Sequence, residues 1–195
     1  MYYDELSETM DHLLQDGKGI LAADESNGTI GKRFDTIGLE NTTENRRDYR
    51  LLLATTNGLE EYINGVILFE ETFDNKDKDG KSIAELFTKK GILPGIKVDK
   101  GLVDLPNTDN EKITQGLDGL TERLLHFKEK GAKFAKWRNV YSISDFSPSL
   151  TAIKAGAETL ARYAACCQAV GIVPIVEPEV LIDGNHSIEQ CAEAC

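Results

Sequence analysis

Five short apolar runs divide the sequence, and each has the length of a β-strand rather than of a helix. Several of them are rich in Val and Ile, which favour strands. The segments between the runs show the apolar spacing of amphipathic helices. The runs span residues 19–23, 65–69, 93–98, 133–137 and 172–176, and the helical segments span residues 43–55, 82–89, 116–130 and 150–170. Strands that alternate with helices predict right-handed crossovers and a parallel sheet.

The pattern predicts one domain without an internal boundary. A length of 195 residues with 41% hydrophobic residues suits a single globular domain, or a piece of a larger one. Residues 75–81 (NKDKDGK) are predicted to form a polar loop, and residues 188–195 a further helix. A five-stranded flavodoxin-like sheet and a (β/α)8 barrel that lacks three strands both fit this order of elements.

The net charge limits the classes of binding partner that the chain can have. Asp and Glu number 33 and Lys and Arg number 22, so the net charge is −11. Such a chain has no basic surplus for nonspecific nucleic-acid binding, although a local pocket for a small anion remains possible. No apolar run approaches the roughly 20 residues that span a bilayer. Residues 1–11 carry four acidic and no basic residues, which predicts neither a signal peptide nor an Arg-rich transit peptide.

Signatures of metal and nucleotide chemistry are missing from the sequence. The three histidines, His12, His126 and His186, form no H-x-x-H or H-E-x-x-H arrangement. The cysteines at 166, 167, 191 and 195 include no C-x-x-C and are expected to be reduced thiols. No G-x-S-x-G, G-x-G-x-x-G or P-loop motif occurs. We therefore expect neither a metal nor a dinucleotide cofactor.

Charged residues within or directly after four of the five apolar runs are the candidates for a functional site. A single charge at a strand end can be explained by a salt bridge. The recurrence of charges at several strand ends favours a shared site, because parallel α/β folds place active sites at the carboxyl ends of strands. Side chains two residues apart on a strand share a face, so lysines and carboxylates should converge. The residues are Asp24 and Glu25; Lys97, Asp99 and Lys100; Lys136 and Arg138; and Glu177 and Glu179. This mixture suits proton transfer around a carbonyl compound that carries phosphate.

Several stretches that contain these residues resemble one family, the class I (Schiff-base) fructose-bisphosphate aldolases. They extend in family order over nearly the whole chain and are together very specific. They are GKGILAADES (17–26), GKR (31–33), ENTTENRR (40–47), GVILFEET (65–72), PGIKVDKG (94–101), QGLDGL (115–120), FAKWR (134–138), LARYA (160–164) and GIVPIVEPE (171–179). The resemblance implies a (β/α)8 TIM barrel, of which residues 1–195 hold about the first five strands and lack the C-terminal part.

The resemblance also implies a reaction and its residues. The reaction is reversible cleavage of fructose 1,6-bisphosphate to glycerone phosphate and glyceraldehyde 3-phosphate through a lysine imine, without a metal or another cofactor. Asp24 matches a residue that assists carbon–carbon cleavage, and Lys136 one that stabilises charge and handles protons. Glu177 matches the general acid/base and Glu179 the carboxylate beside it. The substrate-binding matches are Arg33, Arg46, Lys97 and Arg138; for Arg46, a helix-surface ion pair is the competing interpretation.

The main departure from the family concerns the nucleophile. The Schiff-base lysine of the family lies on the sixth strand in an L-L-K-P-N-type motif, which does not occur in this sequence. We therefore expect the 195 residues alone to be inactive; a non-enzymatic half-barrel binding module is the alternative. The family is commonly tetrameric, so a homotetramer is expected for the full-length protein. At residues 31–33 the sequence has GKR in place of AKR, which is more similar to plastid-type members of the family than to animal members. The expected location is intracellular, in the cytoplasm or the plastid stroma.

Overall fold

A computed structural model describes residues 2–195 and contains a five-stranded parallel sheet with helices on its outer side. The strands follow the order β1-β2-β3-β6-β7, so each new strand of the sheet is added at the same side. Their bounds are β1 Gly19–Ala23, β2 Ile63–Leu68, β3 Leu93–Lys97, β6 Phe134–Tyr141 and β7 Val173–Val180. All five predicted strands are present. This arrangement is a half-barrel, as expected for an incomplete TIM barrel.

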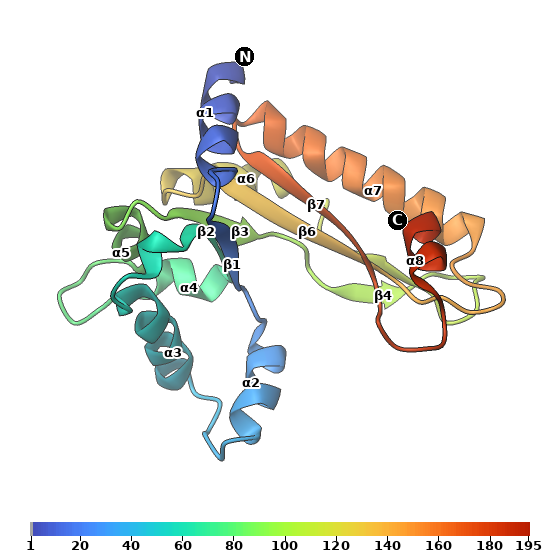
Figure 1. The fold of residues 1–195 in the computed structure, drawn as a ribbon, viewed down its shortest axis with the longest axis horizontal. Coiled ribbons are helices and arrows are strands. Elements are labelled where there is room, and N and C mark those ends of the chain that lie inside the picture. Colours follow the sequence, from blue (N-terminus) through green and yellow to red (C-terminus); the bar gives the residue numbers. More distant parts are fainter. Residues whose placement is uncertain (1) are drawn as a thin grey trace.

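The helices include the predicted ones and several others. The predicted helices are α3 Thr43–Thr55, α5 Ile83–Lys89, α6 Leu120–Glu129, α7 Leu150–Ala169 and α8 Ile188–Ala194. The sequence pattern did not predict α1 Tyr3–Leu13, α2 Asn27–Asp35, α4 Glu70–Asp74, the 3-10 helix Leu59–Glu61, or an antiparallel hairpin of β4 Leu102–Asp104 and β5 Lys112–Thr114. Figure 1 shows α7 lying along β6 and β7, while α2 and α3 project together from the other part of the sheet.

The predicted bounds were wrong for four elements in particular, namely β2, α6, β6 and β7. Strands β6 and β7 extend to Tyr141 and Val180, because they pair with each other along their whole length. Glu177 and Glu179 therefore lie within a strand and do not follow it. Strand β2 ends at Leu68, since Phe69 is the N-cap of α4. Helix α6 begins at Leu120 and not at residue 116, because Gly116 and Gly119 have φ angles of 125° and 61°, outside the right-handed helical region.

Local hydrogen bonds fix where the helices begin. Each of five helices starts after a Ser or Thr whose side-chain oxygen accepts a backbone N–H from the first turn, which satisfies an otherwise unpaired donor. These capping residues are Ser26, Thr42, Ser82, Ser149 and Ser187. Ser26 lies three residues after the end of β1 and caps α2, which begins at the next residue in spite of two glycines that lower its helix propensity.

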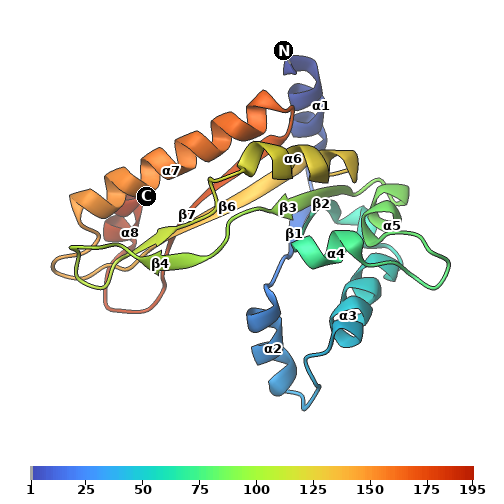
Figure 2. The same ribbon diagram turned by 180° about the vertical axis from the view of Figure 1, so that it is seen from behind.

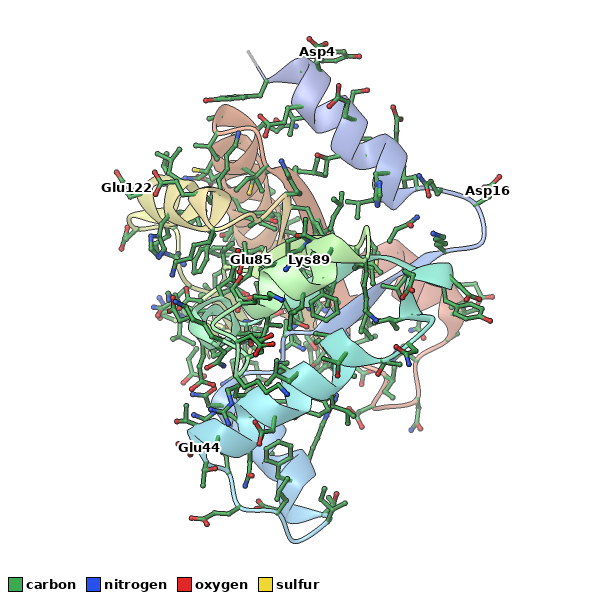
Figure 3. All side chains as sticks on the ribbon, turned by 90° about the vertical axis from the view of Figure 1, so that its left-hand side faces the viewer. Asp4, Asp16, Glu44, Glu85, Lys89 and Glu122 are labelled. Carbon is green, nitrogen blue, oxygen red and sulfur yellow. The ribbon has the colours of Figure 1, made fainter. Side chains whose placement is uncertain are left out.

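The main hydrophobic core lies between the sheet and the outer helices. Alternate strand residues such as Val66, Ile96 and Trp137 point to this side and are fully buried. Tyr163 of α7 packs against Trp137 with ring centroids 5.5 Å apart. Figure 2 shows the same layer from behind, with α6 beside α7. Charged side chains occupy the outside of this layer, and Figure 3 shows Glu44, Glu85 and Glu122 on the outer surfaces of their helices.

The other face of the sheet changes from apolar to charged along the strands. Ile67, Phe134 and Val173 form a second cluster with Leu13 of α1. Two residues further along β6, on the same face, is Lys136. Strands β2 and β3 separate β6 from β1, which would place them about 14 Å apart in a flat sheet. The contact between Lys136 and Asp24 described below therefore requires that the sheet curve with this face concave.

Candidate active site

Lys136 occupies the centre of the site, and two carboxylates from other parts of the sheet surround its ammonium group. Its Nζ lies 2.7 Å from Oδ2 of Asp24 and 3.3 Å from Oε2 of Glu177. Asp24 directly follows β1, and Glu177 lies within β7. Asp24 and Lys136 are buried, with 7% and 9% of their surfaces exposed. Three of the residues selected from the sequence are therefore in direct contact.

The carboxylates determine the protonation state of Lys136. Burial by itself lowers the pKa of the ammonium group, but attraction to Asp24 and then to Glu177 outweighs burial, and the pKa of Lys136 is raised. The amine therefore stays protonated at neutral pH. A protonated amine has no lone pair with which to attack a carbonyl. Lys136 is thus suited to stabilise negative charge and to transfer a proton, and not to act as a nucleophile.

A cavity of about 510 Å³ opens beside these groups at the carboxyl ends of the strands. Both cationic and carboxylate side chains line the cavity. Its volume is large enough for a sugar phosphate, and its cations can pair with the phosphate groups. Five of the eight residues selected from the sequence line it, namely Asp24, Arg33, Lys97, Lys136 and Arg138. The same lining includes Glu25, Ser26, Thr29, Glu70, Asp99 and Lys100.

The other cations of the cavity are also paired with carboxylates. Nζ of Lys97 lies 2.5 Å from Oδ1 of Asp99, and the same oxygen accepts the backbone N–H of Gly101 at 3.1 Å. Arg138 donates from NH1 to Oε2 of Glu179 at 2.9 Å. The predicted sharing of one face by residues two apart holds here, since Lys136 contacts Glu177 and Arg138 contacts Glu179.

Arg33 and Arg46 have different surroundings. Arg33 lies on α2 at the mouth of the cavity, with 62% of its side chain exposed and NH1 bonded to Oε1 of Glu25. Arg46 forms a two-pronged ion pair with Glu71, with Nε donating at 2.7 Å and NH2 at 2.6 Å. The hydrogen bond to Glu71 raises the pKa of Arg46. Arg46 is not among the residues that line the cavity, and its side chain is 13% exposed. Its assignment as a substrate-binding residue stays a prediction.

Residues that the sequence reasoning noted but did not select complete the site. Asp99 is 8% exposed and holds Lys97, and Glu25 is contacted by two arginines. The spacing of Asp99 from Lys97 was a sufficient signal for a shared face. For Ser26 and Thr29 the signal was weaker, because a capping Ser followed three residues later by Thr is common at any helix start.

Within residues 2–195, no group of three or more His, Cys, Asp and Glu side chains is arranged to hold a metal ion. None of the described helices is both long enough and apolar enough to cross a bilayer.

A curved parallel sheet with outer helices and with lysines and carboxylates at the carboxyl ends of its strands defines an α/β protein of the TIM-barrel class. Comparison with known proteins narrows this class. A family model described as "Glycolytic: Fructose-bisphosphate aldolase class-I" matches residues 5–195. The chain belongs to the class I fructose-bisphosphate aldolase family.

Individual relatives agree with this assignment. The chain is 54% identical over 192 residues to the cytoplasmic isozyme of fructose-bisphosphate aldolase from Spinacia oleracea, which covers 98% of the chain and 54% of that protein. It is 54% identical over 192 residues to chloroplastic fructose-bisphosphate aldolase 1 from Chlamydomonas reinhardtii, covering 98% and 51%. A solved structure of fructose-bisphosphate aldolase from Plasmodium falciparum, in complex with TRAP and a small-molecule inhibitor, matches with a TM-score of 0.95 and 55% identity, over 98% of this chain and 56% of that one. The chain spans about half the length of the curated relatives it matches.

Proposed function

We propose that the complete protein cleaves fructose 1,6-bisphosphate reversibly to glycerone phosphate and glyceraldehyde 3-phosphate through a lysine imine. The observation that carries this proposal is the protonated Lys136 held between Asp24 and Glu177 beside a cavity lined with cations. Carbon–carbon cleavage next to a carbonyl needs an electron sink, and a protonated imine supplies one without a metal.

The acid and base roles follow from the contacts. As the amine adds to the carbonyl, the Glu177 carboxylate accepts a proton from the attacking nitrogen. The Glu177 carboxyl then gives this proton to the departing hydroxyl group of the carbinolamine, which leaves as water, and the same transfers run backwards in the reverse direction. Lys136 supplies the cation that stabilises the developing oxyanion. Asp24 accepts the proton of the hydroxyl group, and the loss of this proton starts cleavage. Glu179 holds Arg138 through the hydrogen bond from NH1.

The phosphate groups of the substrate are assigned to the cations of the cavity. Lys97 and Arg138 line its wall, and Arg33 lies at its mouth with most of its side chain exposed. An exposed guanidinium can exchange its carboxylate partner for a phosphate at little cost in desolvation, and it binds phosphate with two parallel hydrogen bonds. Arg46 supports the site from outside through Glu71.

The imine-forming lysine is proposed to lie outside the 195 residues. It must be neutral to attack the carbonyl, and the raised pKa of Lys136 argues against that residue. By analogy with the family, we also propose a homotetramer and an intracellular location, in the cytoplasm or the plastid stroma.

Borohydride trapping tests the proposal. The protein made from its complete coding sequence is incubated with glycerone phosphate and sodium borohydride, and the labelled lysine is mapped by mass spectrometry. We expect one labelled lysine per chain, outside residues 1–195, and no label on the 195-residue polypeptide treated alike. A stoichiometric label on Lys97 or Lys136 would overturn the assignment of roles. Absence of any label together with absence of cleavage would favour the half-barrel binding module.

A further inference from the structure

Arg50 of α3 is a buried cation that the proposed reaction does not use. Only 4% of its surface is exposed, and burial lowers the pKa of its guanidinium although attraction to Glu25 opposes this. A buried charge is costly unless it is closely paired, so its presence behind the site requires an explanation. Arg50 is not among the residues that line the cavity.

Among the described residues, Arg50 makes one hydrogen bond and one ion pair, both with Glu25. NH2 of Arg50 donates to the backbone carbonyl of Glu25 at 3.1 Å and lies 2.9 Å from Oε2 of the same residue. Nε and NH1 have no hydrogen-bond partner within residues 2–195. The face of the guanidinium is covered by Tyr49, with the ring centroid 4.8 Å from Cζ. The cation is thus held in one place and directed at one residue.

Glu25 connects Arg50 to two groups of the site. It directly follows Asp24, so a hydrogen bond to its carbonyl fixes the backbone beside the residue that contacts Lys136. Its second carboxylate oxygen, Oε1, accepts from NH1 of Arg33 at the mouth of the cavity. The Glu25 side chain is only 7% exposed, so solvent cannot replace Arg50 as its partner.

We propose that Arg50 is a positioning residue that holds the turn between β1 and α2 through Glu25, and thereby sets Asp24 against Lys136 and Arg33 at the cavity mouth. The expected change in kcat and KM rests on the proposed function, whereas the expected shift of Asp24 does not. Without Arg50, Glu25 keeps Arg33 as its only cation. The turn is then free to shift, and Arg33 is drawn more strongly to Glu25 and away from a phosphate.

The test compares variants of the protein made from its complete coding sequence. Arg50→Met removes the charge and keeps much of the volume, while Arg50→Lys keeps a cation that can reach the same oxygens. Arg47→Met is the matched control, because Arg47 lies on the same helix, is 39% exposed at its side chain and pairs with the adjacent Asp48. For each protein we would measure kcat and KM for fructose 1,6-bisphosphate, and solve a crystal structure.

We expect Arg50→Met to lower kcat/KM about 10- to 100-fold, with a lower kcat from the displaced Asp24 and a higher KM from the altered Arg33. In its crystal structure, Nζ of Lys136 and Oδ2 of Asp24 should lie more than about 4 Å apart. Arg50→Lys should restore most of the activity, and Arg47→Met should match the wild type. If Arg50→Met does not fold, Arg50→Gln takes its place in both measurements.

Other outcomes separate the two proposals. Unchanged kcat and KM with an unmoved Asp24, even at a lower melting temperature, would show that Arg50 only stabilises the fold, and would overturn the inference. If the wild type does not cleave fructose 1,6-bisphosphate, the proposed function fails, and the position of Asp24 in the Arg50 variant still decides the inference.

Discussion

Nζ of Lys136 lies 2.7 Å from Oδ2 of Asp24, although two other strands separate β6 from β1. The contact spans the concave face of the half-barrel and joins one of its outermost strands to an inner one. It also places a protonated amine and a carboxylate together at the base of a cavity lined mainly by charged and polar side chains. Curvature of the sheet is therefore a condition for the site, as well as a property of the fold.

Replacement of Lys136 by Met should abolish most activity of the complete protein. Removal of a charge-stabilising and proton-transferring group costs about 10²- to 10⁴-fold in rate, so kcat for fructose 1,6-bisphosphate should fall by that amount. Lys133→Met is the control, because Lys133 immediately precedes β6, is 45% exposed at its side chain and lies 4.0 Å from Glu5. Circular dichroism and thermal melting would establish the folded fraction of each variant. A Lys136→Met protein with near wild-type kcat would contradict the proposed role.

The stability of the fold should decrease at alkaline pH, in part because of Cys167. Burial raises the pKa of its thiol from 9.0 to about 12. The unfolded chain therefore releases this proton first as the pH rises, so the stabilisation is complete below pH 9 and is lost between pH 9 and about 12. The raised pKa of Lys136 has the same sign, since its contribution is lost as the pH rises through the folded-state value.

Urea unfolding at pH 8 and pH 10.5 would measure this effect. The wild type should lose about 1–2 kcal/mol more than Cys167→Ala between the two pH values, because the variant lacks the buried thiol. Cys167→Ala is expected to be less stable at both pH values owing to the cavity it leaves, so only the difference between pH values is informative. Equal losses for the two proteins would show that Cys167 ionises alike in the folded and unfolded states.

Gly95→Ala should destabilise the fold by about 1–3 kcal/mol, the usual cost of overpacking. A Cβ at Gly95 of β3 would overlap the aromatic ring of Phe134 on β6, and this ring is fully buried, so it would have to shift within the packed interior. Gly19→Ala is the control, since a Cβ at the start of β1 meets nothing within 4 Å. The free energy of unfolding in urea compares the two variants. A Gly95→Ala protein as stable as Gly19→Ala would mean that Phe134 can be displaced without cost.

The two outer strands of the sheet should exchange their amide hydrogens fastest in the 195-residue chain. Within residues 2–195, β1 pairs only with β2, and β7 only with β6, so each leaves one edge without a partner strand. Such edges favour aggregation or pairing with another chain, and we expect this polypeptide to be poorly soluble. Hydrogen exchange with mass spectrometry should show slow exchange in β3 and fast exchange at the outward edges of β1 and β7. Equal protection in all five strands would contradict this expectation.

The strands and most helices could be predicted from the sequence because their signals are local. An apolar run such as 93–98 has strand length and is followed by charged residues, and both features are visible without knowledge of what the strand packs against. The extra length of β6 and β7 was not predictable, because residues 138–141 are stabilised as a strand by pairing with β7 and not by their own composition. Helix α2 was missed because a capping Ser, and not helix propensity, determines where it starts.

The sequence indicated Asp24, Lys136 and Glu177, which the structure brings together, but it did not indicate which carboxylate pairs with which cation. The alternation of a strand places Lys136 and Arg138 on one face, and the resemblance to the aldolase family pointed to Asp24 and Glu177. The resemblance also pointed to Arg46, whose guanidinium is paired with Glu71. Arg50 was not selected, because nothing in the local sequence distinguishes it from other positions on the buried face of α3.

The amino-acid sequence by itself determined the order of the five sheet strands and of most helices, the charged residues near the strand ends and the family. Each of these depends on neighbouring residues or on matching motifs. Only the tertiary structure decided which carboxylate faces which cation. That choice depends on the curvature of the sheet and on the packing of α2 and α3 beside it, which bring together side chains that are distant in the chain.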